Sequence, residues 1–251
     1  ANMFLGAPDI GLTTLTEIAD HVAAIADAVD LPLLVDADTG FGNPVNMVRT
    51  VRVLERAGAA GVQIEDQVFP KKCGHFAGKD VVPADEMIAK VKAAVDARRD
   101  ADFQIIARTD ARAVLGLDAA LDRAHRMIEA GADVTFVEAP VSEAEIVRIA
   151  TELPVPQIAN IVFGGKTPDL GHSRFAELGF GGVLYANAAL QAALKSAHDV
   201  LAALKRDGSL DAVADSLAGF AERQQAVSKP KFDALEERYN TGAFTKGRPS
   251  A

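Results

Sequence analysis

The chain has 251 residues, of which 49% are hydrophobic and 24% are charged, and its formal net charge is −9. This composition is that of a globular protein with enough apolar side chains to bury a substantial core. The acidic balance, without a long basic run, argues against a nucleic-acid partner.

The cysteine content and the start of the chain bear on its compartment. Cys73 is the single cysteine, so an internal disulfide is excluded, which fits a reducing environment. The sequence has no run of about 18 apolar residues that could span a bilayer. Its first residues lack the basic flank and the long apolar stretch of a secretory signal. We therefore predict a cytoplasmic protein with no membrane partner.

Strand-like and helix-like segments alternate along most of the chain. The first 13 residues are expected to form a loop, and the pattern from Thr14 to Glu17 is that of a capping box that opens a helix. Short apolar runs that end in polar residues then occur at 33–38, 61–66, 103–110, 134–139, 156–162 and 182–187. Segments of helical period lie between and after them, at about 44–58, 84–98, 117–131, 142–152, 172–178 and 188–206.

This alternation predicts an α/β protein with a parallel sheet that is buried on both faces. Six strand–helix units are visible, whereas a closed (β/α)8 TIM-type barrel has eight strands and about 250 residues. Because the chain begins with a loop and a helix that ought to follow a strand, we expect a barrel that lacks its first strands. The alternative is an open, doubly wound sheet of six strands.

The last part of the chain is expected to be a helical extension of the barrel. We place the barrel domain at 1–207 and the helical tail at 208–251, with a break at Pro230. The apolar residues of the tail need a surface to cover, either on the same barrel or on a neighbouring subunit.

Polar side chains stand at the ends of the predicted strands. They are Asp36, Asp38, Glu65, Arg108, Asp110, Glu138, Asn160 and Asn187. The carboxyl ends of parallel strands form the site in such folds, so these side chains are expected to converge. Several carboxylates facing one arginine would repel each other unless a cation lies among them, and oxygen ligands suit Mg²⁺ or Mn²⁺.

Simpler interpretations of these residues remain open. Asp36 and Asp38 could cap the helix that begins near Asn43, and Arg108 could form a salt bridge with Glu138 or Asp110 as well as bind a substrate carboxylate. For Asn160 and Asn187, a role in a turn is as plausible as substrate contact.

The loop that follows Glu65 carries the remaining chemistry-bearing residues. Cys73 lies close to Lys71, Lys72 and His75, where a lowered thiol pKa is plausible. Zinc is less expected, because Cys73 and His75 lack a second ligand pair at a zinc-site spacing. The alternative is an ordinary polar surface loop with an incidental thiol.

Five segments together resemble one known superfamily. They are residues 36–42 (DADTGFG), 63–67 (QIEDQ), 71–75 (KKCGH), 106–111 (IARTDA) and 136–139 (FVEA). The chain is similar, over about residues 4–206, to the isocitrate lyase and phosphoenolpyruvate mutase superfamily. Its likeness is to the branch of 2,3-dimethylmalate lyase and 2-methylisocitrate lyase, some of whose relatives are carboxyphosphonoenolpyruvate phosphonomutases.

The resemblance implies a (β/α)8 barrel, an essential Mg²⁺ and a small carboxylic-acid substrate. It also implies a homotetramer whose C-terminal helix is exchanged between neighbours. We therefore expect a Mg²⁺-dependent carbon–carbon lyase that cleaves a 2-hydroxy di- or tricarboxylate to an oxo acid and a second acid. The alternatives are an oxaloacetate hydrolase or decarboxylase, a phosphonomutase, or a non-catalytic partner in an oligomer.

The resemblance also implies roles for individual residues. Asp38 matches the direct metal ligand, and Asp36, Glu65 and Asp9 match residues that hold the metal, partly through water. The matched substrate-binding and catalytic positions are Arg108, Glu138, Asn160, Gly74, His75 and Cys73. Gly74 and His75 lie on a gating loop, and Cys73 matches the acid/base cysteine of the lyase branch, which favours a lyase over a phosphonomutase.

Overall fold

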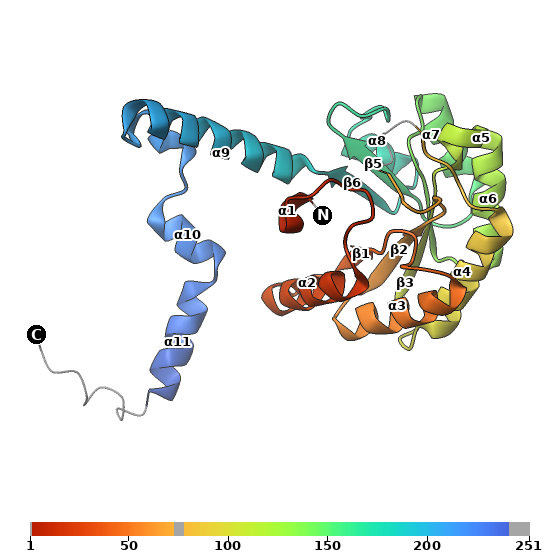
Figure 1. Ribbon diagram of the computed structural model, residues 1–251, viewed down its shortest axis with the longest axis horizontal. Coiled ribbons are helices and arrows are strands. Elements are labelled where there is room, and N and C mark those ends of the chain that lie inside the picture. The colour runs from red at the N-terminus through yellow and green to blue at the C-terminus, as the bar shows by residue number, and fades with distance from the viewer. Residues whose placement is uncertain (1, 73–77, 241–251) are drawn as a thin grey trace, which may run out of the picture. The chain divides into compact units, whose positions relative to one another are not determined.

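The computed structural model describes residues 2–72 and 78–240, and its contacts divide the chain into two compact units, Ala1–Ala188 and Ala189–Ala251. The first unit is built from strands that alternate with helices (Figure 1). Its described strands are β1 Leu34–Asp36, β2 Gly61–Glu65, β3 Gln104–Thr109, β4 Val134–Val137, β5 Ile158–Val162 and β6 Gly182–Ala186.

Each strand pairs in parallel with the strand that follows it in the sequence. The order is β1-β2-β3-β4 in one sheet and β5-β6 in a second, and a parallel bridge between Thr135 and Gln157 continues the order from β4 to β5. The Thr135 hydroxyl also donates to Oε1 of Gln157 at 2.7 Å. A doubly wound sheet reverses its strand order at a switch point, whereas a TIM-type barrel does not. The α/β barrel prediction is therefore confirmed.

The helices of the first unit begin and end close to where the sequence predicts. The long ones are α2 Leu15–Ala28, α3 Pro44–Arg56, α4 Ala84–Ala97, α6 Leu117–Glu129 and α7 Glu143–Glu152, and α8 His172–Glu177 is shorter. The predicted capping box of Thr14 and Glu17 is present at the start of α2. Asn43 and Asn46 form a second one at α3, so neither Asp36 nor Asp38 caps that helix.

The core lies between these helices and the strands. All five residues of β2 are buried, as expected for a parallel strand covered on both faces. Large apolar side chains with no exposed surface fill the space around it: Met47, Leu54, Val62, Ile64, Met87 and Ile105. Each such side chain contributes about 1.5–3 kcal/mol by leaving water. The ends of the strands are thereby held in fixed positions.

One short helix contradicts the sequence prediction, and a second one was not predicted. Residues Asn2–Leu5 form α1 where a loop was expected, and the ring of Phe4 lies against that of His21 on α2, with centroids 4.9 Å apart. Residues Ala111–Leu115 form α5 directly after β3. Gly116 separates α5 from α6 with φ 93°, a conformation that favours glycine.

The second unit consists of helices without a core of their own. They are α9 Ala188–Asp207, which begins at the last residue of the first unit, the 3-10 helix η1 Asp211–Ser216, α10 Phe220–Ala226 and α11 Lys229–Tyr239. Pro230 lies in the first turn of α11 instead of breaking a helix, because proline needs no hydrogen-bonded N–H there. Among the described residues after 188, Ala203 is the one that is buried.

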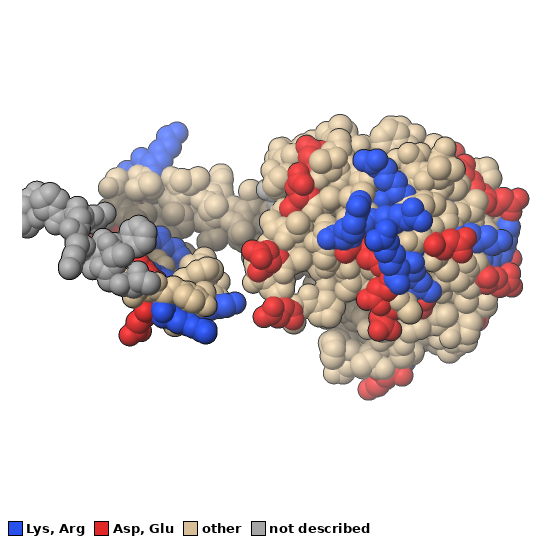
Figure 2. Space-filling view, turned by 90° about the horizontal axis from the view of Figure 1, so that it is seen from below, with Lys and Arg blue, Asp and Glu red and all other residues tan. Residues whose placement is uncertain are grey.

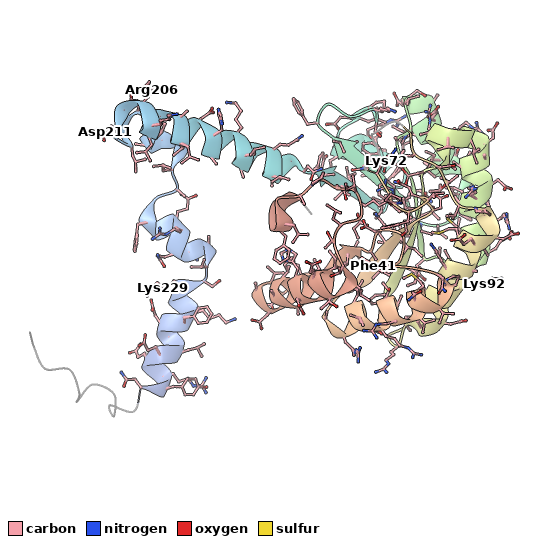
Figure 3. All side chains as sticks on the ribbon, viewed as in Figure 1. Phe41, Lys72, Lys92, Arg206, Asp211 and Lys229 are labelled. Atoms are coloured by element: carbon pink, nitrogen blue, oxygen red, sulfur yellow. The ribbon has the colours of Figure 1, made fainter. Side chains whose placement is uncertain are left out.

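Charged side chains are mixed on the surface of the first unit. Figure 2 shows the face over α3 and α4, where basic side chains gather centrally and acidic side chains lie around them. Figure 3 shows Lys92 on the outer side of α4, where it is exposed, and Lys72 among the side chains around the strands. Within the described residues no helix is long and apolar enough to cross a membrane.

Candidate active site

A cavity of about 430 Å³ opens at the carboxyl ends of the strands in the first unit. Its lining includes six residues predicted from the sequence as polar groups of the site: Asp9, Asp36, Glu65, Arg108, Asn160 and Asn187. Gln63, Lys71, Lys72 and apolar side chains of the strands form most of the rest of its wall. The site is thus where the ends of parallel strands are expected to place one.

The end of β1 is shaped by a tight turn. Although Asp36 and Asp38 were both predicted at the end of a strand, β1 ends at Asp36, and Asp38 has φ 48°. The backbone N–H of Asp38 donates to Oδ1 of Asp36 at 2.9 Å, which fixes the Asp36 carboxylate against the turn. Gly40 follows with φ 90°, and a Cβ there would lie 2.7 Å from Sδ of Met47. The close packing of this turn on α3 therefore requires glycine.

Lys71 is the group that sequence reasoning missed. Its Nζ lies 2.6 Å from Oδ1 of Asp9 and 2.7 Å from Oδ1 of Asp38, and 5% of its side chain is exposed. Burial works against its charge, but the carboxylates of Asp36, Asp38 and Glu65 outweigh burial and raise the pKa of Lys71 well above its ordinary value. The sequence showed Lys71 only as a neighbour of Cys73, because its carboxylate partners are distant along the chain.

Glu65 lies at the end of β2 with 1% of its surface exposed. Burial is the main cause that raises its pKa from 4.5 to about 8, with Asp36 and Asp110 adding to it and Arg108 and Lys71 opposing it. Its Oε1 atom has no hydrogen-bond partner among the described residues. A buried acceptor without a partner is costly, so this oxygen is suited to an additional ligand.

Arg108 is surrounded by carboxylates at the end of β3. Its Nε donates to Oδ2 of Asp110 at 3.0 Å and lies 3.4 Å from Oε2 of Glu65, and its Nη2 lies 3.7 Å from Oε2 of Glu138. Its guanidinium carbon is also 5.2 Å from the ring centre of Phe136. Burial opposes the charge, yet Glu138, Asp110 and Glu65 raise the pKa of Arg108 well above its usual range. The predicted salt bridges to Asp110 and Glu138 are both present.

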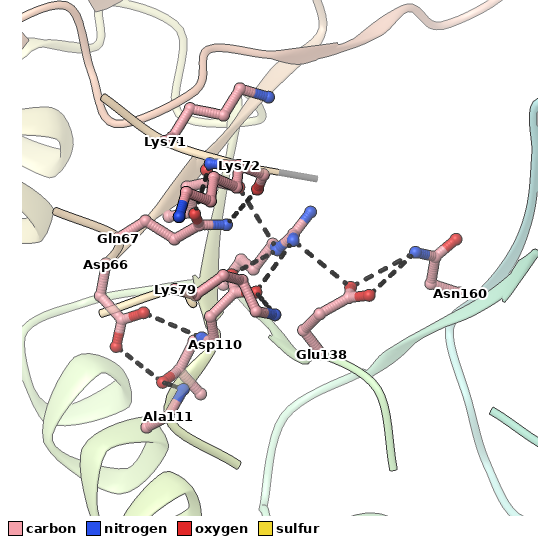
Figure 4. Close-up of polar contacts among 12 residues, drawn as sticks. Asp66, Gln67, Lys71, Lys72, Lys79, Asp110, Ala111, Glu138 and Asn160 are labelled. Atoms are coloured by element: carbon pink, nitrogen blue, oxygen red, sulfur yellow. Dashed lines mark hydrogen bonds and ion pairs between the residues drawn. The ribbon is translucent and has the colours of Figure 1, made fainter. Parts of the chain in front are cut away.

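Glu138, directly after β4, is hydrogen-bonded to Asn160 in the middle of β5. The Asn160 amide nitrogen is 3.3 Å from each carboxylate oxygen of Glu138 (Figure 4). Because Glu138 fixes the amide, Oδ1 of Asn160 is oriented with it, and that oxygen has no hydrogen-bond partner among the described residues. The pair therefore offers an acceptor at the cavity wall. Asn187 also lines the cavity, with φ 61° directly after β6.

A buried network behind the cavity holds the end of β3. The carboxylate of Asp66 accepts from the Thr109 hydroxyl at 2.7 Å and from the Asp110 N–H at 2.8 Å (Figure 4). It also accepts from Nη1 of Arg123 at 3.1 Å. On the other side, Nζ of Lys79 donates to Oδ1 of Asp110 at 2.6 Å. Asp110 is thereby held in the position that contacts Arg108.

The loop after β2 is tied to the site at both of its described ends. Gln67 exchanges two hydrogen bonds of 2.8 Å with the backbone of Lys72, which fixes the chain next to Lys71. At the other described end of the loop, Nζ of Lys79 donates a hydrogen bond to Asp110. The predicted loop residues Cys73, Gly74 and His75 lie outside the described residues.

The metal prediction can be compared with the donor groups that are present. Asp9, Asp36, Asp38 and Glu65 supply oxygen atoms only, and Oε1 of Glu65 lacks a partner in the described part of the chain. Oxygen donors of this kind are the ligands that a small divalent cation such as Mg²⁺ prefers. The described residues do not, however, include three His, Cys, Asp or Glu side chains already arranged to hold a metal. The cation among these carboxylates is the ammonium of Lys71.

Comparison with known proteins supports this combination of fold and site. The family described as phosphoenolpyruvate phosphomutase matches residues 2–205. The chain belongs to the phosphoenolpyruvate mutase/isocitrate lyase superfamily. It is 45% identical over 238 residues to 2,3-dimethylmalate lyase of Eubacterium barkeri, covering 95% of this chain and 82% of the relative. It is 46% identical over 213 residues to 2-methylisocitrate lyase of Aeropyrum pernix, covering 85% and 68%.

Solved structures of this superfamily share the fold. A 2,3-dimethylmalate lyase matches with a TM-score of 0.90 and 30% identity, covering all of this chain and 84% of that one. Oxaloacetate acetylhydrolase in complex with 3,3-difluorooxalacetate has the same score and identity, with 97% and 83% covered. A phosphonopyruvate hydrolase in complex with oxalate and Mg²⁺ has a TM-score of 0.83 and 32% identity, with 95% and 83% covered. The prediction of an enzyme of this superfamily is thus confirmed.

We predict that Arg123→Met destabilises the protein by about 3 kcal/mol, because it leaves Asp66 buried without its cation. The matched control is Arg126→Met on the same helix, where the partner Asp85 is exposed and the loss is expected to stay below about 1 kcal/mol. Urea denaturation of both variants measures the difference. Equal losses would show that the Asp66 network does not stabilise the end of β3.

We also predict that Glu65 makes the metal-free protein less stable as the pH rises. Its pKa is 4.5 in the unfolded chain and about 8 in the folded one, so folding takes up a proton between these values. The stability that Glu65 contributes is complete below the lower pKa and is lost as the pH rises through the higher one.

The measurement is thermal denaturation in a chelator from about pH 5 to about pH 9. The melting temperature of the wild type should fall more steeply over this range than that of Glu65→Gln, which cannot ionise. Glu152→Gln, on the exposed face of α7, is the control and should follow the wild type. If the melting temperatures of all three proteins fell equally with pH, the raised pKa of Glu65 in the folded protein would be contradicted.

Proposed function

We propose that the protein is a Mg²⁺-dependent carbon–carbon lyase. Its substrate would be a 2-hydroxy di- or tricarboxylate of the substituted-malate or methylisocitrate type, cleaved to an oxo acid and a second acid. The observation that carries this proposal is one cavity that joins the oxygen-rich group around Glu65 to the guanidinium of Arg108. The 45% identity to a 2,3-dimethylmalate lyase supports it.

Asp9, Asp36 and Glu65 of the proposed metal ligands line the cavity, and Asp38 is linked to them through its contacts with Asp36 and Lys71. Asp38 would bind the ion directly, and Asp36, Glu65 and Asp9 would hold it, partly through water. Mg²⁺ prefers such oxygen ligands and Mn²⁺ can replace it. When bound, the ion would polarise the carboxylate and the neighbouring oxygen of the 2-hydroxy acid.

The other residues are proposed to bind substrate and handle charge. Cleavage removes the proton of the 2-hydroxyl group, which becomes the oxo group, and breaks the bond between the hydroxyl-bearing carbon and its neighbour. The electron pair stays on that neighbouring carbon, which belongs to the departing acid and requires a proton donor. Arg108 would neutralise the negative charge that develops there, and Oδ1 of Asn160, held by Glu138, would accept a hydrogen bond from the substrate. Cys73 would donate the proton, with Gly74 and His75 beside it on the loop.

Hydrolysis of oxaloacetate is the second candidate function. The TM-score of 0.90 to an oxaloacetate acetylhydrolase favours it, because the same cation and arginine would hold oxaloacetate by its oxo acid end. Decarboxylation of oxaloacetate and phosphonomutase chemistry would use the same anchoring groups, but the phosphonomutase reaction needs no proton donor such as Cys73.

A homotetramer in the cytoplasm is proposed as the assembly. The helices of the second unit leave large apolar side chains exposed, among them Leu194, Leu201, Phe220, Phe232 and Tyr239. Such a surface on a chain with this family relationship supports packing against a neighbouring copy.

We predict Mg²⁺-dependent release of pyruvate or glyoxylate from one of 2,3-dimethylmalate, 2-methylisocitrate and isocitrate. The assay adds oxaloacetate as a fourth substrate. If oxalate is released from oxaloacetate and none of the other three acids is cleaved, the protein is a hydrolase and not a lyase. Cys73→Ser tests the proton donor: it should lower lyase turnover strongly while leaving Mn²⁺ affinity unchanged. Release of the oxo acid without added metal, in the presence of a chelator, would contradict the proposed mechanism.

A further inference from the structure

Lys71 occupies a position that a metal site would need. Its ammonium lies between Asp9 and Asp38, at 2.6 Å and 2.7 Å, and its side chain is almost fully buried. Both partners belong to the four carboxylates proposed above to hold the divalent ion. We infer that Lys71 is a built-in counter-ion of this site, and that a divalent cation must displace its ammonium from Asp38 in order to bind. The inference rests on the metal site of the proposed function.

The ammonium and a metal ion cannot share Asp38 without strong repulsion. A Mg²⁺ ligand oxygen lies about 2.1 Å from the ion. The Lys71 nitrogen is 2.7 Å from Oδ1 of Asp38, so an ion bound to the same oxygen would lie less than about 5 Å from that nitrogen. Like charges at that separation oppose each other strongly in a partly buried site. Binding of the ion is therefore an exchange of one cation for another.

The exchange also favours divalent over monovalent ions. Lys71 carries one positive charge, and its ammonium contacts the carboxylates of Asp9 and Asp38. A monovalent ion would replace the single positive charge of Lys71 by another single charge, so the carboxylates would face no more positive charge than before. A divalent ion brings a second charge to a group that also includes Asp36 and Glu65, whose Oε1 has no partner in the described structure.

The neighbouring Lys72 provides a comparison within the same loop. Its Nζ donates to the carbonyl oxygen of Gly78 at 2.7 Å, and its backbone is held by Gln67. Lys72 lines the same cavity and carries the same charge, but its bonding partner is a carbonyl and not a carboxylate of the metal site. Loss of its charge removes only a screened, long-range repulsion.

The test is calorimetric titration of the metal-free protein with Mn²⁺. Lys71→Met removes the competing charge, and we expect its dissociation constant to fall at least about tenfold. Lys71→Arg keeps a cation and should stay within about threefold of the wild type, as should Lys72→Met, whose ammonium donates to a carbonyl oxygen and not to a carboxylate. Circular dichroism checks that each variant is folded.

A second measurement uses the wild type alone and does not depend on a variant. The reactivity of each lysine toward an acetylating reagent is measured by mass spectrometry with and without Mg²⁺, with the exposed Lys92 as the internal reference. Displacement predicts that labelling of Lys71 rises when Mg²⁺ is added while labelling of Lys92 stays constant.

The outcomes separate this inference from the proposed function. If the wild type binds Mn²⁺ but Lys71→Met binds it no more tightly, and Mg²⁺ leaves the labelling of Lys71 unchanged, the displacement is wrong and the metal site remains. If the wild type binds no Mn²⁺ at all, the metal site and the inference both fail. Tighter binding by Lys71→Met together with unchanged binding by Lys72→Met supports the inference.

Discussion

The balance of charge at the carboxyl ends of the strands is the constraint on which the site depends. Asp9, Asp36, Asp38 and Glu65 gather there, and the cations that face them are Lys71 and Arg108. Buried or half-buried carboxylates are stable only when they are paired, hydrogen-bonded or protonated. Lys71 pairs Asp9 and Asp38, while Glu65 keeps one oxygen without a partner in the described structure. The carboxylates of the site therefore outnumber the cations that face them, which favours binding of an added cation.

The barrel brings side chains from several strands together around Arg108. Arg108 comes from β3, and the groups that hold it come from β2, β3 and β4. Behind them, Arg123 of α6 neutralises Asp66, and Asp66 fixes Asp110 through its backbone. Because each link is buried, the guanidinium is oriented before any substrate arrives, as electrostatic catalysis requires. The same arrangement explains why relatives with different named activities can share one fold.

Most of the fold was predictable, because hydrophobic runs and helical periods determine where strands and helices lie. The capping pattern of Thr14 and Glu17 and the strand that carries Arg108 follow from local sequence. The turn at Asp38 could not be predicted in this way, since it depends on the packing of Gly40 against Met47. α1 and α5 were missed because short helices have little periodicity to detect.

The residues of the site also divide into those that the sequence predicts and those that it does not. Asp36, Glu65 and Arg108 stand at or next to strand ends, so topology brings them together, whereas Asp9 lies in the loop before α2. Lys71 and Arg123 were not found, because the sequence does not show which distant carboxylate each of them pairs with.

The most direct test is to count Mn²⁺ ions bound per chain by electron paramagnetic resonance. The account predicts one ion for the wild type, binding weakened at least about tenfold in Asp38→Asn, and no change in Asp118→Asn on the exposed face of α6. Mn²⁺ binding that survives Asp38→Asn unchanged would contradict the claim that these strand ends form a metal site.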